Sequence, residues 1–254
     1  MRPKNPSRRQ FCLLSGSTIA SIALGSACKQ IGGSVIVSDG RLSARPRNGV
    51  KTAATGEIKL GLDTRRDAVL QIPKNATSSP LPLLIMLHGA TQSSDEMFWC
   101  LGTAHEEAGI AVLAPNSHDT TWDAMGGDGF GIDVEYLNRA LERVFETTAI
   151  DPARVSIGGF SDGASYGLSL GLINGDFFKS IIAFSPGFVI NGELHGQPRI
   201  YISHGTHDHI LPIDTCGRRI AAGLKSYGYD VTFREFDGDH EIPAGIAREG
   251  LSWC

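Results

Sequence analysis

The sequence predicts an α/β fold in which a mostly parallel sheet is covered by helices on both faces, as a three-layer sandwich. Short apolar, β-branched runs alternate along the chain with segments of helical periodicity, and this alternation is typical of β-α-β units. Residues 83–87 and 110–114 are apolar throughout, as expected of strands buried on both faces of a parallel sheet. Residues 133–148 have an apolar face with a charged face opposite, which predicts a helix.

The composition is that of a globular protein. The chain has 254 residues, of which 41% are hydrophobic and 20% charged, enough for one sizeable α/β domain. The formal net charge of −4 argues against nucleic acid as a partner. Once the N-terminus is set aside, no stretch is apolar enough to span a bilayer.

Residues 1–27 have the pattern of an export signal. Basic residues without an acidic one precede an apolar, Ser- and Gly-rich stretch over residues 11–25, which is too short to cross a membrane. Residues 7–11, Ser-Arg-Arg-Gln-Phe, resemble the twin-arginine signal that carries folded proteins across the bacterial inner membrane. A general secretory signal that happens to hold two arginines is the alternative. On either interpretation the mature protein is expected to leave the cytoplasm and to be periplasmic or secreted.

Two further features follow the signal. Cleavage close to Cys28 could yield a lipoprotein, but Gly25 stands where a lipoprotein signal usually has leucine. We therefore expect membrane contact only if Cys28 is lipidated. Residues 28–56 are rich in Gly, Ser and Arg, which predicts a linker or a loosely held lead-in before the main domain at 57–254.

The elements of the main domain follow in order. We expect strands over residues 57–62, 67–72, 83–87, 110–114, 180–184, 199–203 and 230–236, with a further strand before residue 159. We expect helices beginning at 94–96, running through 103–108, and over 133–148, 214–227 and 243–253. The long Gly- and Asp-rich loop at 115–131 is of the kind that is usually functional or mobile.

One stretch, residues 154–167, organises the rest. Val155 and Ile157 predict a strand, and residues 159–163, Gly-Phe-Ser-Asp-Gly, match the pattern G-x-S-x-G. In that pattern a serine, here Ser161, occupies a tight turn from strand to helix with its oxygen held away from the backbone. Small neighbours are needed because a larger side chain would meet the other arm of the turn. A Gly-rich β-to-α turn with an incidental serine is the alternative interpretation.

Two later loops hold the partners that a nucleophilic serine needs. A serine hydroxyl requires a base to take its proton, and the base requires an orienting acid. After Ser161 the loop at 204–212 holds Asp208, and the loop at 236–240 holds His240. Each loop follows a predicted strand, so the three residues can meet outside the carboxyl ends of the sheet. The order Ser, acid, His is that of strand-turn-helix hydrolases.

With these motifs, the chain from about residue 57 to its end resembles the α/β-hydrolase superfamily. The Gly-Phe-Ser-Asp-Gly turn, the His-Gly-Thr-x-Asp-x-x-x-Pro loop and the Gly-x-His loop are similar to its phospholipase/carboxylesterase and polyhydroxybutyrate-depolymerase-like branches. The resemblance implies the α/β-hydrolase fold, with residues 57–254 as the catalytic domain. It also implies Ser161 as nucleophile, His240 as general base and acid, Asp208 as the orienting residue, and no cofactor.

The resemblance further implies an oxyanion hole of two backbone N–H groups. One belongs to Asp162, directly after the nucleophile, and the other to Ala90, in a His-Gly-x loop after a predicted strand. We expect His88 to pack beneath that loop. Position 162 departs from the pattern because close relatives often carry a neutral residue there. Its N–H can still serve, whereas its carboxylate would disfavour anionic substrates.

The other acidic residues and histidines near these motifs are interpreted as structural. Asp214 could replace Asp208 as the acid, but it is placed as the start of a helix; Asp237 and Asp239 are expected to be loop residues. Neither the histidines of the acid loop nor the aspartates of the long loop have the spacing of zinc or calcium motifs, so we predict no metal site. The residues in question are His204, His207, His209, Asp123, Asp128 and Asp133.

Apolar residues near these motifs are candidates for the acyl or alcohol pocket, and each could equally be core. They are Met97, Phe98, Trp99, Trp122, Phe188 and Ile210. The cysteines fit export, because an oxidising compartment permits a disulfide. Cys216 and Cys254 lie close to the starts or ends of late helices, and we expect them to pair, with Cys100 left over.

The sequence therefore predicts an exported serine hydrolase that acts on small-molecule or polymeric carboxylic esters. One alternative keeps the same residues and changes the substrate: a polyester (polyhydroxybutyrate-type) depolymerase or a feruloyl-type esterase. An alternative of another class is a non-catalytic binding protein on the same fold, since fold does not determine function. The sequence does not indicate an oligomeric state.

Overall fold

The computed structural model describes residues 38–52, 54–76, 80–127 and 129–254. The expected export signal, its cleavage site, Cys28 and Asp128 therefore lie outside the described residues. Within the described residues, no helix combines the length and apolarity needed to cross a membrane.

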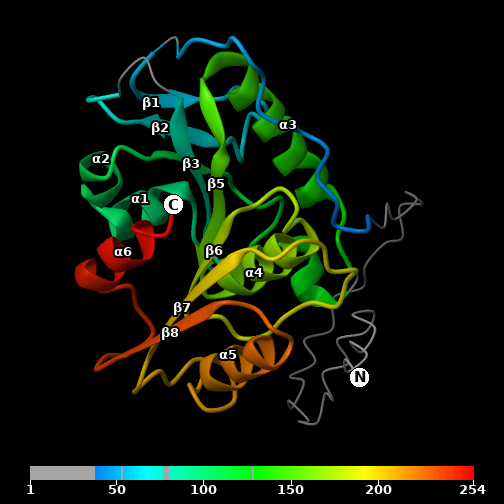
Figure 1. Cartoon of the computed structure of the whole chain (residues 1–254), viewed down its shortest axis with the longest axis vertical. Coiled ribbons are helices and arrows are strands. Elements are labelled where there is room, and N and C mark those ends of the chain that lie inside the picture. The colour runs from blue at the N-terminus through cyan, green and yellow to red at the C-terminus, as the bar shows by residue number, and fades with distance from the viewer. Residues whose placement is uncertain (1–37, 53, 77–79, 128) are drawn as a thin grey trace, which may run out of the picture.

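An eight-stranded sheet runs through the centre of the molecule in the order β1-β2-β4-β3-β5-β6-β7-β8 (Figure 1). Strands β3 to β8 run parallel to one another, whereas β2 is antiparallel to both of its neighbours, β1 and β4. The strands are β1 (Gly56–Lys59), β2 (Val69–Ile72), β3 (Leu81–Leu87), β4 (Ala111–Ala114), β5 (Ile150–Phe160), β6 (Ser180–Phe184), β7 (Arg199–Gly205) and β8 (Val231–Phe236). Every residue of β3, β4 and β6 is buried, which is why these segments are continuous apolar runs in the sequence.

Helices cover both faces of the sheet, so the predicted three-layer α/β fold is confirmed. The helices are α1 (Ser94–Leu101), α2 (Ala104–Glu107), α3 (Ile132–Thr147), α4 (Asp162–Ile173), α5 (Gly217–Ser226) and α6 (Ala244–Leu251), with a short 3-10 helix η1 (Asp123–Gly126). Helices α3, α4 and α5 lie on one face of the sheet and α1, α2 and α6 on the other (Figure 1). A cluster of buried side chains joins each group of helices to the sheet.

Two differences between the element boundaries and the sequence prediction have a clear structural cause. Helix α5 begins at Gly217, because the preceding residues form a turn in which the N–H groups of Thr215 and Cys216 both donate to the carbonyl of Pro212. Strand β5 begins before Pro152, at Ile150, and its pairing with β3 shifts register between Leu81 and Leu83. The shift accommodates a proline that cannot donate a ladder hydrogen bond.

The lead-in is packed on the domain over residues 38–52, which corrects the expectation of a loosely held linker there. The Arg41 guanidinium forms an ion pair with Asp176 at 2.8 Å. The N–H of Leu42 donates to the Asn174 side chain at 2.9 Å, and the N–H of Ala44 donates to Asn138 at 2.9 Å. Since Leu42 and Ala44 are also buried, this segment is part of the core that covers α3 and α4.

The expected pairing of Cys216 with Cys254 is wrong. All three cysteines in the described part of the chain, Cys100, Cys216 and Cys254, are free. Cys216 directly precedes α5, and Cys254 packs against the cluster under α6. The two helices lie on opposite faces of the sheet, so the sheet itself separates the two thiols.

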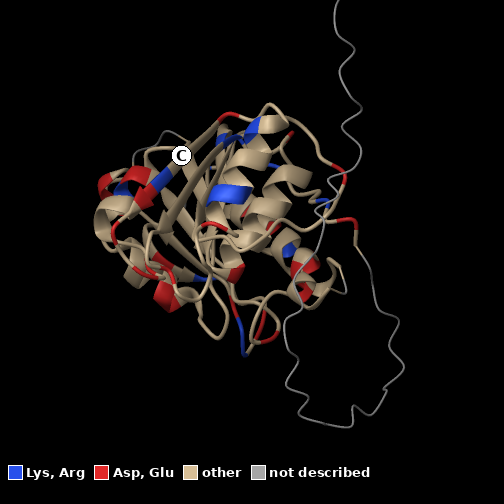
Figure 2. Cartoon of the chain, turned by 90° about the horizontal axis from the view of Figure 1, so that it is seen from below, with Lys and Arg blue, Asp and Glu red and all other residues tan. Residues whose placement is uncertain are grey.

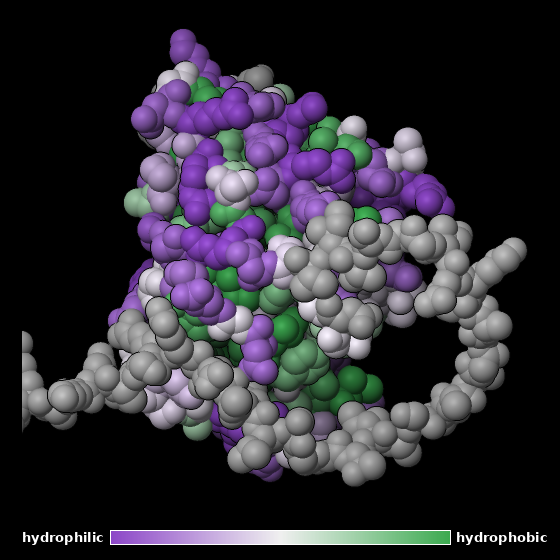
Figure 3. All heavy atoms as spheres, turned by 90° about the vertical axis from the view of Figure 1, so that its right-hand side faces the viewer, coloured by the Kyte–Doolittle hydropathy of each residue, from purple (hydrophilic) through white to green (hydrophobic). Residues whose placement is uncertain are grey.

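The surface carries charges of both signs. In Figure 2 acidic and basic segments are interspersed along the ribbon, without a continuous basic stripe. On the face turned toward the viewer in Figure 3, which includes α3, hydrophilic residues dominate and hydrophobic residues show between them.

Candidate active site

Ser161 lies at a sharp turn between the end of β5 and the start of α4. Its backbone has φ 55° and ψ −119°, a strained combination for a residue with a side chain. A Cβ on Gly159 would lie 2.3 Å from the carbonyl oxygen of Gly163, and one on Gly163 would lie 2.2 Å from that of Leu87. The chain is therefore too crowded here for any residue but glycine, and the Ser161 N–H is held by the Phe184 carbonyl at 3.0 Å.

The loop after β3 passes directly over this turn. A Cβ on Gly89 would lie 3.2 Å from the Ser161 Cβ, so the loop backbone borders the serine. The N–H of Gly89 is occupied by the Gln92 side chain at 3.0 Å, whereas the exposed Ala90 follows at the surface. Asp162 is the first residue of α4, where N–H groups have no partner within the helix. Gly89, directly before Ala90, therefore borders Ser161, and Asp162 directly follows Ser161 in the chain.

The carboxylate of Asp162 has a partner of its own. Its Oδ2 accepts a hydrogen bond of 2.7 Å from the hydroxyl of Thr121, which belongs to the long loop before α3. This contact attaches the long loop to the start of α4. The carboxylate is therefore held beside the nucleophile at a defined position.

His88 packs beneath the loop, as expected. The N–H of Ser117 donates to its Nε2 at 3.0 Å, so Nδ1 carries the proton and donates to the Gly89 carbonyl at 2.7 Å. Burial lowers the pKa of His88, which keeps the ring neutral. The indole of Trp122 donates to the His88 carbonyl at 2.8 Å, which further fixes the loop.

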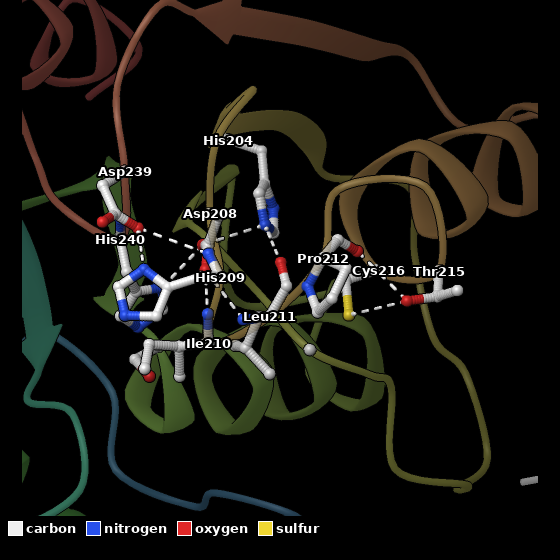
Figure 4. A network of polar contacts seen from close by, with 12 residues as sticks. His204, Asp208, His209, Ile210, Leu211, Pro212, Thr215, Cys216, Asp239 and His240 are labelled. Atoms are coloured by element: carbon white, nitrogen blue, oxygen red, sulfur yellow. Dashed lines mark hydrogen bonds and ion pairs between the residues drawn. The ribbon is translucent and has the colours of Figure 1, made fainter.

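Asp208 and His240 meet at the ends of the neighbouring strands β7 and β8 (Figure 4). The distance between His240 Nδ1 and Asp208 Oδ2 is 2.6 Å. The other carboxylate oxygen, Oδ1, accepts from the N–H groups of Ile210 at 3.0 Å and Leu211 at 2.7 Å. The Asp208 side chain is fully buried and that of His240 is 13% exposed. Such shielding from water strengthens a charge-assisted hydrogen bond.

The His240 ring also approaches the serine turn. It packs on the ring of Phe160, the residue before Ser161, with centroids 4.7 Å apart. Within the described residues, the Ser161 hydroxyl makes no hydrogen bond to His240.

Asp239 joins the loops that carry the acid and the histidine. Its Oδ1 accepts from the His240 N–H at 2.8 Å and lies 2.6 Å from His209 Nδ1 (Figure 4). The backbones of the two loops are also paired, because His207 N–H donates to the Gly238 carbonyl at 2.9 Å. Asp239 was expected to be an ordinary loop residue; here its carboxylate helps to place His240.

The competing acids do not contact His240. Asp214 forms an exposed ion pair with Arg218 at 2.7 Å, and Asp237 lies 3.2 Å from the exposed His207. Within the described residues, no group of three or more His, Cys, Asp or Glu side chains is arranged to hold a metal ion.

The aspartates of the long loop serve the backbone instead. Buried Asp133 accepts from the N–H groups of His118 at 2.7 Å and Asp123 at 2.8 Å. Asp123 in turn accepts from the Tyr166 hydroxyl at 2.9 Å. Burial raises the pKa of Asp133 to about 6. These bonds fix the loop that carries Thr121 and Trp122 against α4.

The candidate pocket residues divide into core and surface. Met97 and Trp122 are buried at 0% and 1% exposure and belong to the two core clusters, which is the alternative that the sequence left open for them. Phe98 is half-buried against the second cluster. Trp99, Phe188 and Ile210 are 83%, 38% and 57% exposed. Periodicity could not separate these cases, because apolar residues at a helix start or in a loop serve either role.

Phe188 and Ile210 belong to segments that adjoin each other. A Cβ on Gly187 would lie 3.3 Å from the Leu211 side chain, and the N–H of Gly187 donates to Ser165 Oγ at 2.9 Å. The loop after β6 is therefore seated between the first turn of α4 and the acid loop. Its Phe188 and the acid loop's Ile210 present exposed apolar surface at this rim.

Sequence reasoning missed His204. Its Nε2 lies 3.1 Å from Asp208 Oδ2, and its side chain is fully buried. The only signal was its place four residues before the acid at the end of a strand, which does not indicate that the loop turns back over it.

Comparison with known proteins gives both sequence and structural similarities. The sequence model of the Phospholipase/Carboxylesterase family matches residues 127–246. Acyl-protein thioesterase 1 of Gibberella zeae is 25% identical over 120 residues, which cover 44% of this chain and 50% of that protein. S-formylglutathione hydrolase of Rattus norvegicus is 27% identical over 141 residues, 46% of this chain and 50% of that protein. The chain spans about half the length of these curated relatives.

Solved structures share the fold over more of the chain. An S-formylglutathione hydrolase from Staphylococcus aureus has a TM-score of 0.63 at 16% identity and covers 83% of this chain and 99% of its own. Esterase PE8 has a TM-score of 0.60 at 21% identity, with coverage of 75% and 98%. The Bacillus cereus carboxylesterase has a TM-score of 0.57 at 18% identity, with coverage of 75% and 94%. These likenesses concern the fold, which is the one that the sequence predicts.

Proposed function

We propose that the chain is an α/β-hydrolase of the serine type that cleaves carboxylic esters through an acyl-enzyme. The observation that carries the proposal is the 2.6 Å contact between His240 Nδ1 and Asp208 Oδ2, next to the strained turn at Ser161. A buried carboxylate on one nitrogen of a histidine leaves the other nitrogen to act as a base.

In the proposed reaction, Ser161 Oγ attacks the ester carbonyl while His240 Nε2 takes the hydroxyl proton. The carbonyl oxygen becomes an oxyanion that the N–H groups of Ala90 and Asp162 stabilise. The C–O bond to the alcohol then breaks, and His240 returns the proton to the leaving oxygen. Water repeats the sequence on the acyl-enzyme, which releases the acid and restores the serine.

Asp208 holds His240 in the tautomer with its proton on Nδ1 and stabilises the imidazolium that forms during attack. The two N–H donors act mainly on charge that develops in the transition state, where the loss of one costs on the order of 3 kcal/mol. The Asp162 carboxylate, held at 2.7 Å by Thr121, adds negative charge beside the nucleophile. We propose that this charge disfavours anionic acyl groups and favours neutral esters.

The exposed apolar rim supports a second candidate substrate. Phe188 and Ile210, 38% and 57% exposed, adjoin the acid loop and offer a surface for a large apolar ester. This favours a polyhydroxybutyrate-type depolymerase or a feruloyl-type esterase over an enzyme for short soluble esters alone. Hydrolysis rates on p-nitrophenyl esters of graded acyl length, an aryl ferulate and polyhydroxybutyrate particles distinguish these substrates.

Covalent labelling tests the proposed chemistry against a binding protein on the same fold. A fluorophosphonate should label the wild-type chain and fail to label Ser161→Ala, and His240→Ala should lower both labelling and ester hydrolysis. We expect kcat for hydrolysis to fall by several powers of ten in either variant, because the residues act as a unit. Ser226→Ala, at an exposed serine, serves as the matched control. Near-wild-type hydrolysis by folded Ser161→Ala would contradict the proposal.

We also propose that residues 1–27 are a twin-arginine-like export signal and that the mature protein is periplasmic or secreted. The basis is sequence alone: the paired arginines at positions 8 and 9, followed by an apolar stretch. Changing both arginines to lysine should trap the precursor in the cytoplasm if the twin-arginine route is used. Unchanged export would favour a general secretory signal, and labelling with a fatty-acid analogue reports acylation of Cys28.

A further inference from the structure

His204 is buried at the end of β7, directly against the proposed catalytic acid. Its side chain and that of Asp208 are both 0% exposed. The Nε2 atom of His204 lies 3.1 Å from Asp208 Oδ2 and 2.7 Å from the Leu211 carbonyl oxygen (Figure 4). The histidine therefore contacts the same carboxylate oxygen that His240 uses.

The surroundings of His204 determine where its proton is. Both neighbours of Nε2 are acceptors, so Nε2 carries the proton and donates. The Nδ1 atom is buried without a hydrogen-bond partner, and a Cβ on Gly217 would lie 2.6 Å from it. A second proton on Nδ1 would be a buried donor with no acceptor, which is costly. Burial also lowers the pKa of His204, so the ring is neutral.

With His204, four nitrogen atoms lie close to the Asp208 carboxylate. Asp208 Oδ1 accepts from the N–H groups of Ile210 and Leu211. Oδ2 lies 2.6 Å from His240 Nδ1 and 3.1 Å from His204 Nε2, whose shorter contact, at 2.7 Å, is with the Leu211 carbonyl. Because two nitrogen atoms contact each oxygen, the Asp208 carboxylate is held in one orientation, with Oδ2 facing His240. Sharing Oδ2 between two N–H donors also spreads its negative charge.

We propose that His204 is a positioning residue for the proposed catalytic acid, which acts by donating its Nε2–H to the oxygen of Asp208 that orients His240. This inference rests on the proposed roles of Asp208 and His240. The donated hydrogen bond lowers the strength with which the carboxylate stabilises the His240 imidazolium.

The other ionisable groups around His204 do not perform this task. Glu235 on β8 pairs in register with His204, but its carboxylate is bound to Arg218 at 2.8 Å on the exposed side. Cys216 adjoins from the start of α5, and burial raises the pKa of its thiol, which keeps it neutral. On the acid and histidine loops, the groups that face His204 are Asp208 and His240 themselves.

Three substitutions test the role. Glutamine places an amide N–H close to the position of Nε2, so His204→Gln should preserve the donor. Asparagine ends near the position of Nδ1, and phenylalanine has no donor, so His204→Asn and His204→Phe should lose it. We expect kcat to fall by about ten- to a hundredfold in the Asn and Phe variants, from loss of a hydrogen bond to a charged group, with little change in KM. The Gln variant should stay within about threefold of wild type, a difference below one hydrogen bond.

The pH profile separates positioning from a purely structural role. Without the donor, Asp208 stabilises the His240 imidazolium more strongly, so the acid limb of kcat/KM should move up by about 0.5–1 pH unit in the Asn and Phe variants. Rates are expressed per active site, counted by fluorophosphonate labelling. If His204 has only a structural role, the Asn and Phe variants should show fewer active sites or a lower Tm, with the acid limb of kcat/KM unchanged. That result would overturn the inference.

A measurement on the wild-type chain keeps the test independent of variant folding. The ¹⁵N chemical shifts of His204 should report a neutral ring protonated on Nε2 across the pH range of activity. A cationic ring, or a proton on Nδ1, would contradict the inference. If Ser161→Ala retains activity, the proposed function fails; if Ser161→Ala is inactive while the His204 variants keep the wild-type pH limb, only the inference fails.

Discussion

The rings of Phe160 and His240 pack with centroids 4.7 Å apart, although the two residues are separated by most of the C-terminal half of the chain. Phe160 ends β5 and precedes Ser161, whereas His240 follows β8 at the far edge of the sheet. The loop after β8 therefore folds back across the ends of β7 and β6 to reach the serine turn. This return path explains why the acid loop, the histidine loop and the serine turn depend on one another.

Asp208→Asn should be the most damaging change among the acidic residues of the two loops. The amide can present a donor to His240 Nδ1, which favours the wrong tautomer. The same change in a serine protease lowers kcat by about 10⁴, and we expect a loss of that order. Asp214→Asn and Asp237→Asn should each cost less than about tenfold, because their partners are exposed surface groups. Steady-state kinetics on one ester decides; a crippled Asp214→Asn beside a mild Asp208→Asn would reassign the acid.

We expect Asp239 to support kcat through the hydrogen bonds at its Oδ1 and not through its negative charge. Oδ1 accepts from the His240 N–H at 2.8 Å and contacts His209 Nδ1 at 2.6 Å, so Asp239→Ala loses both bonds. We expect kcat to fall about tenfold, the equivalent of one hydrogen bond. Asp239→Asn keeps an acceptor at Oδ1 and should stay close to wild type. Equal losses in Asp239→Ala and Asp239→Asn would show that the charge, and not the hydrogen bond, is what counts.

Gly163→Ala should prevent the serine turn from closing. The new Cβ would lie 2.2 Å from the Leu87 carbonyl oxygen, so backbone must move and the free energy of unfolding should fall by at least about 3 kcal/mol. Gly245→Ala is the matched control, since α6 has open space at that position. Replacing glycine by alanine inside a helix should stabilise the protein by up to about 1 kcal/mol. Chemical denaturation of both variants measures the difference, and a native-like Gly163→Ala would contradict the described turn.

The stability of the protein should fall as the pH drops below about 6.5, the usual pKa of histidine. Burial lowers the folded-state pKa of His105, which is 3% exposed, and that of His88. At these two histidines the unfolded chain therefore binds more protons than the folded one below pH 6.5, and the stability that they contribute, fully present above this value, is lost as the pH falls.

His105→Leu should reduce that loss, because it removes one group that must stay neutral in the folded state. Each pH unit by which the folded and unfolded pKa values differ corresponds to about 1.4 kcal/mol. Urea denaturation at pH 8 and pH 5 measures the change in unfolding free energy, with His118→Gln at an exposed position as the control. A variant with the same pH dependence as the wild type would exclude His105 as a source of acid sensitivity.

Several features were predictable from the sequence because they depend on local pattern. The apolar runs at β3 and β4 predicted buried parallel strands, and the periodicity of residues 133–148 predicted α3 almost to its ends. The glycines around Ser161 predicted a tight turn, since only the backbone and its nearest neighbours decide whether a Cβ fits. The order of Ser161, Asp208 and His240 along the chain predicted which loops could meet at one edge of the sheet.

Other features depend on contacts between segments far apart in the chain, which no local pattern records. Met97 and Trp122 are core, and Phe188 and Ile210 are surface, because neighbouring helices and loops cover the first pair and leave the second pair open. The lead-in is held by Asn138 and Asn174, polar residues with no periodic signature. Cys216 and Cys254 are separated by the sheet, and their spacing in the chain does not indicate this.

The sequence by itself determined the layers of the fold, the serine turn and the candidate residues for its chemistry, because propensity, periodicity and steric fit act over a few residues at a time. Only the tertiary structure decided which groups surround Asp208. The 2.6 Å contact to His240 and the 3.1 Å contact to His204 arise where the loops after β7 and β8 fold back on one another. The physical reason is that a buried carboxylate must satisfy its oxygens with whatever donors the folded chain brings to it, and those donors come from separate strands and loops.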